Sequence, residues 1–227
     1  MTRRQTLVVG GLTPFTTIDF PGRLAAVIFC QGCSWRCAYC HNPHLLPPRS
    51  ATEHSWPAFV NWLDSRRGLL DGVVFSGGEP LLQRGLADAV GEVRSLGFAV
   101  ALHTAGAYPQ RLQALLPQLD WVGFDVKAPF SDYRAVTGCD AGERAKQSLA
   151  ILLASGKPNE LRCTVDERFL GDDELCLMAD QLASMGATRL VLQTRREATG
   201  KPVLRDRQRL DRLAKRVAKL QFSQNDG

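Results

Sequence analysis

Residues 24–43 read LAAVIFCQGCSWRCAYCHNP, a short apolar run followed at once by a cysteine-rich loop. The apolar run has the length and composition of a buried β-strand. Cys33, Cys37 and Cys40 follow it with the spacing C-x3-C-x2-C, which confines three thiols to eight positions. A tetrahedral metal site takes four ligands. The loop therefore predicts a metal centre in which one position is left for another ligand.

Two kinds of metal centre fit three clustered cysteines. A zinc ion would need Cys30, His41 or His44 to complete its tetrahedron, but zinc sites usually pair one such motif with a second, distant one, and the sequence offers no second pair. Iron–sulfur clusters also take cysteine thiolates. Three thiolates on a four-iron cluster leave one iron free to bind a small molecule through oxygen and nitrogen. The spacing therefore favours a [4Fe–4S] cluster over zinc.

The composition is that of an ordinary globular protein, with 44% hydrophobic and 22% charged residues in a chain of 227. No apolar run approaches the roughly 20 residues that span a bilayer, and the N-terminal stretch lacks the apolar segment of a secretory signal. Seven cysteines, four of them within eleven residues, do not resemble a disulfide framework. We expect a cytoplasmic protein without a membrane partner, in which Cys139, Cys163 and Cys176 are small buried apolar residues.

The C-terminal region carries most of the net charge of +5, because residues 195–219 hold ten Lys or Arg against three Asp or Glu. Leucine and valine recur there at helical spacing, which predicts a basic amphipathic helix over 205–220 with a solvated charged face. A basic surface can also attract an acidic partner. No aromatic residues alternate with these charges, so we do not expect nucleic-acid binding.

Apolar β-like runs alternate with segments of helical periodicity along the chain. Strands are expected at 24–30, 72–75, 98–102, 119–124, 160–165 and 188–192. Helices are expected at about 55–66, 83–96, 109–117, 141–155, 173–185 and 205–220. Repeated strand–helix units predict a parallel sheet with right-handed crossovers.

Six such units are two fewer than a closed eight-unit barrel needs. The predicted fold is therefore α/β, an open partial (β/α)6 barrel in a single domain over 1–227, with its core at about 20–200. Residues 5–22 are expected to lead into the first strand. A doubly wound Rossmann-type sheet is the alternative, although no G-x-G-x-x-G motif follows an early strand.

Chemically distinctive residues fall at the carboxyl ends of the predicted strands, where ligands bind in both architectures. After the cysteine loop come four further groups at or near strand ends: SGGEP (76–80), HTAG (103–106), DVK (125–127) and QTRR (193–196), with Arg162 inside the fifth strand. All six strand ends thus contribute to one predicted rim. This alignment predicts a binding site there.

Taken singly, these motifs have ordinary explanations as well. Paired glycines such as Gly77 and Gly78 permit close backbone approach to a ligand, but they also form tight turns. Glu79 can accept a hydrogen bond from an ammonium group. Asp125 and Lys127 form a pair common on surfaces, and His103 alone is more often a capping or packing residue than a catalytic one.

The cysteine spacing, with Tyr39 before the last cysteine and G-G-E-P after the second strand, resembles the radical S-adenosylmethionine superfamily. TIDFPGRLAAVIFCQGCSWRCAYCHNP (residues 17–43) is similar to the opening of glycyl-radical-enzyme activating enzymes, where T-x-D-x-P-G precedes Q-G-C and C-H-N-P. Within that group, FTTIDFPG and the chain length are most similar to the activating proteins of anaerobic ribonucleoside-triphosphate reductase. The resemblance covers residues 12–200.

This resemblance implies the cofactors and the reaction. S-adenosylmethionine would bind the open iron of a [4Fe–4S] cluster, one electron would break its carbon–sulfur bond, and the resulting 5′-deoxyadenosyl radical would take hydrogen from a glycine of the partner. The implied iron ligands are Cys33, Cys37 and Cys40. The implied cofactor-binding residues are Tyr39, Gly77, Gly78, Glu79, His103, Asp125, Lys127, Arg162 and Gln193, with Lys127 also given a catalytic role.

The sequence differs from some relatives at His103, and the assignment of one cofactor-binding residue in the last strand is open. Relatives that activate pyruvate formate-lyase have Asp, in D-T-N-G, where this chain has His103, and that Asp helps to hold a monovalent cation. The replacement puts a cation site in question here. The polar residue of the last strand is either Gln193 or Arg195.

The resemblance also implies the partners: a glycyl-radical enzyme, most similar to anaerobic ribonucleoside-triphosphate reductase, and an electron donor such as flavodoxin or ferredoxin. Asp19 would bind the backbone of the incoming glycine loop, although Asp also commonly caps its own turn. Two alternatives are a small-molecule radical enzyme like 7-carboxy-7-deazaguanine synthase and a non-catalytic zinc or iron–sulfur module.

Overall fold

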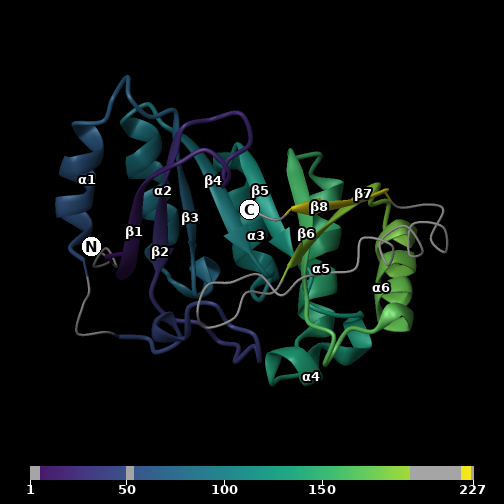
Figure 1. The fold of residues 1–227 in the computed structure, drawn as a ribbon. Helices are drawn as coiled ribbons and strands as arrows, with labels where there is room; N and C mark the ends of the chain where they lie inside the picture. Colours follow the sequence, from purple (N-terminus) through teal and green to yellow (C-terminus); the bar gives the residue numbers. More distant parts are fainter. Residues whose placement is uncertain (1–5, 50–53, 195–220, 226–227) are drawn as a thin grey trace.

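The computed structural model describes residues 6–49, 54–194 and 221–225, which form one eight-stranded sheet (Figure 1). The strand order follows the chain, with β1 antiparallel to β2 and every later pair of neighbours parallel. In this part of the chain β1 and β8 are the two edges, so the predicted open barrel is confirmed. The strands are β1 (Val9–Thr16), β2 (Ala25–Cys30), β3 (Gly72–Gly77), β4 (Ala99–Thr104), β5 (Trp121–Asp125), β6 (Asn159–Val165), β7 (Arg189–Thr194) and β8 (Gln221–Asn225).

The main helices cover the outer face of the curved sheet, while central strands such as β4 and β5 point toward the lower half of Figure 1, where α4 lies. Ser55 caps the first helix by accepting a hydrogen bond from the Ala58 amide, and Pro57 stands in its first turn. None of the described helices has both the length and the apolar character needed to cross a bilayer. The helices are α1 (Trp56–Asp64), α2 (Leu86–Ser95), α3 (Pro109–Leu115), α4 (Tyr133–Thr137), α5 (Gly142–Ala154) and α6 (Asp172–Ser184).

The six predicted strands are all present, but two strands and one α-helix of the described chain were not predicted. The stretch expected only to lead in contains β1, whose two glycines and proline give it little β-propensity. The short helix α4 and the edge strand β8 were also not predicted. The predicted helix over 205–220 and the alternative Arg195 lie outside the described residues.

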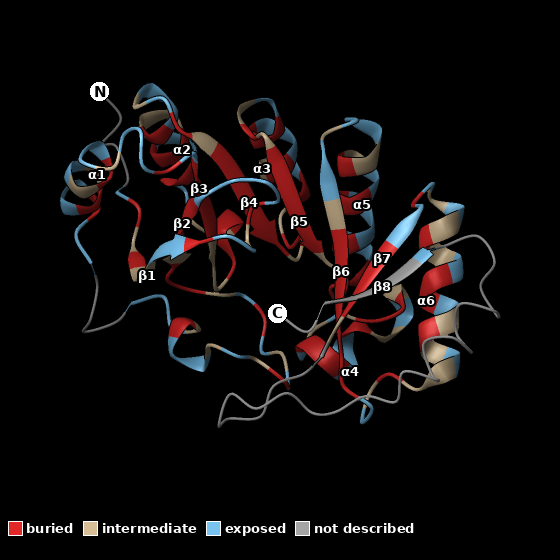
Figure 2. Ribbon diagram, turned by 45° about the horizontal axis from the view of Figure 1, so that its top comes forward, coloured by how far each residue is buried: buried red, intermediate tan, exposed pale blue. Residues whose placement is uncertain are grey.

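Buried residues fill both sides of the sheet, and in Figure 2 the central strands are largely red. The larger core lies between the sheet and the outer helices. A smaller inner cluster consists of Phe20, Ala25, Val27, Val74, Ala101 and Trp121. Strands buried on both faces must be apolar throughout, which is why their sequences are near-continuous apolar runs.

Residues 17–24, here called the floor loop, join β1 to β2 and close the inside of the barrel. Phe20 is 3% exposed, and its ring centroid lies 6.2 Å from that of Trp121 in β5. The floor loop therefore fills the interior behind the carboxyl ends of the strands. This filling leaves the space at those ends for a ligand.

Candidate active site

The cysteine loop, residues 31–43, is anchored by hydrogen bonds between its first residues and the residues that directly follow it. The amide of Gly32 donates to the carbonyl of Leu45 at 2.7 Å, and that of Cys33 donates to Leu46 at 3.2 Å. The Gln31 side-chain amide donates to the carbonyls of His44 and Pro47, at 3.1 and 2.7 Å. These bonds hold the loop closed around its cysteines.

The middle of the cysteine loop rests on α4. The amide of Arg36 donates to the carbonyl of Thr137 at 2.9 Å, and the amide of Ala38 donates to Val136 at 3.0 Å. Trp35 is 2% exposed and meets the ring of Tyr133 edge-on, with centroids 5.9 Å apart. The unpredicted helix α4 thus supports the loop that carries the cysteines.

The thiols of Cys33, Cys37 and Cys40 line one cavity. Burial raises the pKa of Cys33 to about 11 and also raises that of Cys37. Among the described residues, no three His, Cys, Asp or Glu side chains converge tightly enough to surround one metal ion. A four-iron cluster takes each thiolate on a different iron, so three thiols around one cavity suit a cluster better than a single zinc ion.

The paired glycines at the end of β3 pack closely against the chain's own backbone. Gly77 has φ +115°, and an added Cβ there would lie 2.3 Å from the backbone nitrogen of Cys30. A Cβ at Gly78 would lie 2.2 Å from the Gly32 carbonyl oxygen and 3.2 Å from Cys33 Cβ. The base of the cysteine loop therefore requires glycine at both positions, and both glycines also line the cavity where the sequence predicts a ligand.

Glu79 is 2% exposed and ties the ends of β3 and β4 together. Its Oε1 accepts from the Thr104 hydroxyl at 2.8 Å and the Leu81 amide at 3.1 Å, and its Oε2 accepts from the Ala105 amide at 3.1 Å. Burial raises the pKa of Glu79, although these hydrogen bonds oppose the shift. Thr104 has a structural role here that sequence reasoning missed.

A chain of charged side chains crosses the cavity from β5 to β6. Lys127 Nζ lies 3.2 Å from Asp125 Oδ2, and Arg162 places Nη2 3.0 Å and Nε 3.1 Å from Asp125 Oδ1. Burial would raise the pKa of Asp125, but the charges of Lys127 and Arg162 outweigh it and hold that pKa well below its usual range. Burial would likewise lower the pKa of Lys127, yet Asp125 keeps it well above normal. Asp125 and Lys127 are therefore both charged at neutral pH.

The aromatic part of the cavity carries polar atoms that the described chain does not satisfy. The Tyr39 hydroxyl and the Trp35 indole nitrogen are buried without a hydrogen-bond partner in the described structure. Lys127 Nζ lies 5.9 Å from the centroid of the Tyr39 ring. Buried polar atoms in native proteins usually have partners, so these two atoms suit a cavity that receives a polar ligand.

His103 connects the charged chain to the floor loop. It is 9% exposed, and its Nε2 lies 2.9 Å from the Asp19 carbonyl oxygen and 3.4 Å from Arg162 Nη1. Burial, and then the charge of Arg162, lower the pKa of His103 to about 3. The Asp19 carboxylate accepts from the Thr16 hydroxyl at 2.6 Å. His103 is thus a neutral side chain that holds the floor loop against β4.

The structure brings every predicted site residue into this cavity, whose volume is about 270 Å³. Ser76, Thr104 and Thr164 also line it. Ser76 and Thr104 belong to the predicted motifs SGGEP and HTAG but were given no role of their own, and Thr164 was not predicted. Thr164 donates to Gln193 Oε1 at 3.4 Å, and its place two residues after Arg162 on a strand could have indicated a shared face. The predicted residues in the lining are Asp19, Cys33, Cys37, Tyr39, Cys40, Gly77, Gly78, Glu79, His103, Asp125, Lys127, Arg162 and Gln193.

The donor set fits the two implied cofactors. Three thiols suit iron of a cluster, because thiolates are its usual protein ligands. Lys127 and Arg162 supply positive charge for a carboxylate, and the Tyr39 and Trp35 atoms lack partners among the described residues. The cavity therefore combines a cluster-binding edge with a polar, charged interior.

Comparisons with known proteins agree with this geometry. Residues 27–175 match the model of the Radical SAM superfamily. A protein of Methanocaldococcus jannaschii described as a glycyl-radical enzyme activating enzyme is 32% identical over 181 residues, covering 74% of this chain and 72% of its own. The pyruvate formate-lyase-activating enzyme of Clostridium pasteurianum is 35% identical over 127 residues, 53% of each chain.

Among solved structures, Streptococcus suis SuiB bound to S-adenosylmethionine superposes with a TM-score of 0.65 at 13% identity. The superposition covers 86% of this chain and 48% of SuiB, so the present chain spans about half the length of that protein. At this identity the likeness concerns the fold. Together with the match over residues 27–175, it agrees with the cavity described above: the chain belongs to the radical SAM superfamily.

Proposed function

We propose that this enzyme activates a glycyl-radical enzyme by generating a radical on a glycine of its backbone. One observation carries the proposal: Asp19 of the floor loop lines the same cavity as the three clustered thiols. Asp19 belongs to the stretch that resembles the activating enzymes, and the M. jannaschii and C. pasteurianum relatives named above carry that description. The cofactors are a [4Fe–4S] cluster and S-adenosylmethionine, as in the superfamily.

Bound together, a reduced cluster and S-adenosylmethionine would supply the one-electron chemistry that removes a hydrogen atom from glycine, with the electron coming from an external donor. The protein's part is to bind and orient them and to exclude water. Cys33, Cys37 and Cys40 would hold three irons. Arg162 and Lys127, fixed by Asp125 between them, would meet the carboxylate end of the methionine group. The Tyr39 side of the cavity would receive the adenine.

Asp19 would hold the glycine segment of the partner. Its carboxylate keeps one oxygen on the Thr16 hydroxyl at 2.6 Å, which leaves acceptor capacity for an incoming backbone amide. Its backbone carbonyl accepts a hydrogen bond from His103, which holds the floor loop against β4. Hydrogen abstraction needs the glycine α-carbon close to the radical, and small misplacements are costly.

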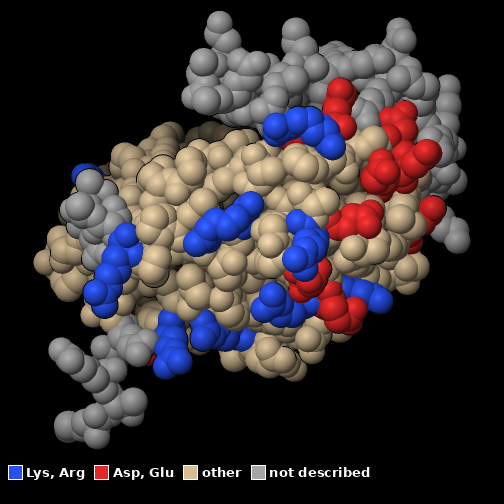
Figure 3. Space-filling model, turned by 90° about the horizontal axis from the view of Figure 1, so that it is seen from below, with Lys and Arg blue, Asp and Glu red and all other residues tan. Residues whose placement is uncertain are grey.

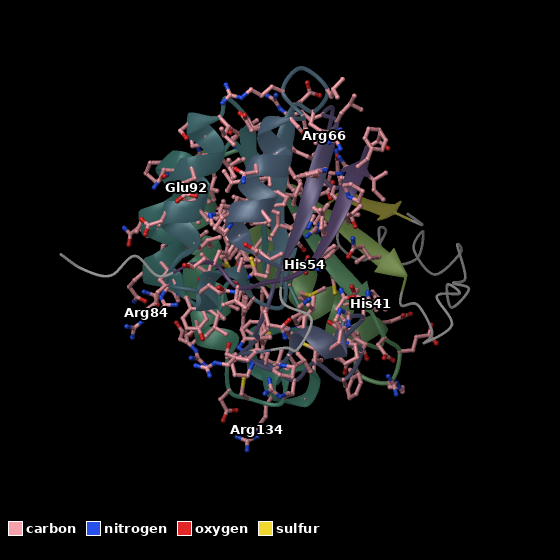
Figure 4. All side chains as sticks on the ribbon, turned by 90° about the vertical axis from the view of Figure 1, so that its left-hand side faces the viewer. His41, His54, Arg66, Arg84, Glu92 and Arg134 are labelled. Carbon is pink, nitrogen blue, oxygen red and sulfur yellow. The ribbon has the colours of Figure 1, made fainter. Side chains whose placement is uncertain are left out.

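The partner we favour is anaerobic ribonucleoside-triphosphate reductase, because FTTIDFPG resembles its activating proteins. We place the reaction in the cytoplasm, with a flavodoxin or ferredoxin as electron donor. Arg36 in the cysteine loop and Arg134 in α4 are exposed beside the cysteines, and Arg134 extends outward at the lower end of Figure 4. Figure 3 shows Lys and Arg over this lower face together with Asp and Glu toward one side, and an acidic donor would approach the cluster over the basic part.

The test uses reconstituted, reduced enzyme with S-adenosylmethionine and the candidate reductase. A glycyl-radical signal in electron paramagnetic resonance is expected on the reductase, and Asp19→Ala should reduce it at least tenfold while cluster content and cofactor binding stay near normal. Asp180→Ala, on the exposed side of α6, is the matched control. If Asp19→Ala activates the partner as well as the parent does, Asp19 serves only its own turn.

The alternative, a radical enzyme for a small molecule, gives a different result in the same experiment. Such an enzyme would leave every protein glycine unchanged while still cleaving S-adenosylmethionine. Cofactor cleavage without a radical on any glycyl-radical enzyme would therefore contradict the activase. Stoichiometric zinc without sulfide would instead contradict both and favour a non-catalytic module.

A further inference from the structure

The inner face of β5 leaves a gap at Gly123 that the guanidinium of Arg162 fills. Trp121, Gly123 and Asp125 alternate along the strand and so face the same side of the sheet. Arg162 of β6 pairs in register with Asp125, but a Cβ added at Gly123 would lie 2.8 Å from Arg162 Cζ, 2.8 Å from Nη2 and 3.0 Å from Nη1. The Arg162 side chain therefore runs back along β5 and lies directly over Gly123.

Residues on two sides of Arg162 hold its guanidinium over Gly123. The side chain is 10% exposed, and Asp125 fixes it from one side through Nε and Nη2. His103, which pairs with Gly123 across β4 and β5, stands 3.4 Å away on the other side. In the parent protein these contacts hold the guanidinium in one orientation over the backbone of Gly123.

We infer that Gly123 is a positioning residue of this enzyme: its missing side chain seats Arg162 so that the guanidinium meets the carboxylate of the bound cofactor. The inference rests on the proposed role of Arg162 in binding S-adenosylmethionine. An alanine Cβ at 2.8 Å would have to part from the guanidinium by about 0.7 Å to reach ordinary carbon contact. Because the obstructing atoms are the far end of a flexible side chain, Arg162 would shift and the fold would survive.

The experiment measures the dissociation constant of S-adenosylmethionine for cluster-loaded enzyme. Gly123→Ala should weaken binding about tenfold, since hydrogen bonds to charged groups contribute about a factor of ten or more. Its iron content and melting temperature should match those of the parent. Gly91→Ala is the matched control, because its Cβ would meet only ordinary contact, 3.9 Å from Gln118 Oε1.

Arg162→Lys provides the decisive comparison, because lysine has no planar guanidinium to collide with a Cβ at position 123. Arg162→Lys alone should weaken binding about tenfold to a hundredfold, and adding Gly123→Ala to it should cause no further loss. An additive loss in the double variant would overturn the seating role, as would parent-like binding by Gly123→Ala alone. If Gly123→Ala fails to fold, recovery of the fold when Arg162→Lys is added supports the clash, and failure of the double variant as well refutes it.

A cofactor-independent readout separates this inference from the proposed function. The Arg162 Nε–H, held 3.1 Å from Asp125, should exchange slowly with solvent and show its own nuclear magnetic resonance signal in the parent and in Gly91→Ala. Gly123→Ala should speed that exchange at least several-fold. If the exchange changes as expected but Arg162→Lys binds the cofactor normally, Gly123 does position Arg162, and the proposed role of Arg162 in binding the cofactor is wrong. If the exchange rate in Gly123→Ala is unchanged, Gly123 does not position Arg162 and the inference is wrong.

Discussion

The Nε2 atom of His103 lies 2.9 Å from the backbone carbonyl oxygen of Asp19. A carbonyl can only accept, so Nε2 must carry the proton, and Arg162 Nη1 at 3.4 Å cannot donate to that same nitrogen. The imidazole is therefore a neutral donor that ties the end of β4 to the floor loop. A doubly protonated ring would place a second positive charge next to Arg162 in a buried site.

This arrangement predicts a loss of stability in mild acid. The pKa of His103 is lowered to about 3 in the folded protein, against about 6.5 unfolded. The unfolded state therefore binds the proton first, and this group's contribution to stability falls as pH drops from about 6.5 toward 3, by ~1.4 kcal/mol per pH unit. In urea unfolding, the parent should lose about 1 kcal/mol more than His103→Gln between pH 7 and 5.5. Equal pH dependence in the two proteins would show that His103 titrates normally.

Cysteine substitutions should separate cluster ligands from structural cysteines. Cys33→Ala, Cys37→Ala and Cys40→Ala should each abolish the brown colour and the bound iron and sulfide of anaerobically reconstituted protein. Cys30→Ala is the matched control, because Cys30 is fully buried within β2 and burial raises its pKa strongly. Iron and sulfide analysis checks the result. Loss of the cluster in Cys30→Ala together with its retention in Cys40→Ala would mean that the ligands are assigned wrongly.

Gly78→Ala should disturb the cluster before it disturbs the cofactor. Its Cβ would lie 2.2 Å from the Gly32 carbonyl oxygen, a rigid backbone atom at the base of the cysteine loop. The loop must move, so we expect incomplete cluster incorporation, at least twofold below the parent by iron analysis. Gly91→Ala should incorporate a full cluster. If Gly78→Ala incorporates a full cluster but binds S-adenosylmethionine weakly, Gly78 contacts the cofactor directly and does not act through the cysteine loop.

Glu79 should prove structural as well as functional. Glu79→Ala leaves the Leu81 and Ala105 amides without their buried acceptor, which should cost roughly 2–4 kcal/mol of unfolding free energy. Glu79→Gln keeps one carbonyl oxygen and should lose less. Both variants should bind S-adenosylmethionine more weakly in equilibrium dialysis. A Glu79→Ala protein with parent-like stability and weak cofactor binding would mean that the carboxylate serves the cofactor alone.

Much of the fold was predictable because the parallel strands carry their own signal. A strand buried on both faces must be apolar throughout, and β2 to β5 and β7 are largely such runs close to their predicted bounds. β6 (NELRCTV) instead alternates polar and apolar residues, which is the other sequence signal of a strand. The elements that were missed lack this signal. β1 contains Gly10, Gly11 and Pro14 and owes its place to pairing with β2, while α4 is five residues long and is held by the cysteine loop.

The sequence alone determined which side chains gather at the site. Residues that directly follow parallel strands must meet at one edge of the sheet, whatever the detailed packing, and so Cys33, Glu79, His103, Asp125 and Gln193 could be grouped without coordinates. Only the tertiary structure decided which of these residues contact one another. That Gly78 makes room for Gly32, that Gly123 makes room for Arg162 and that His103 holds the Asp19 carbonyl are contacts between segments far apart along the chain. Such contacts depend on where the chain returns in space, which local residue preferences do not encode.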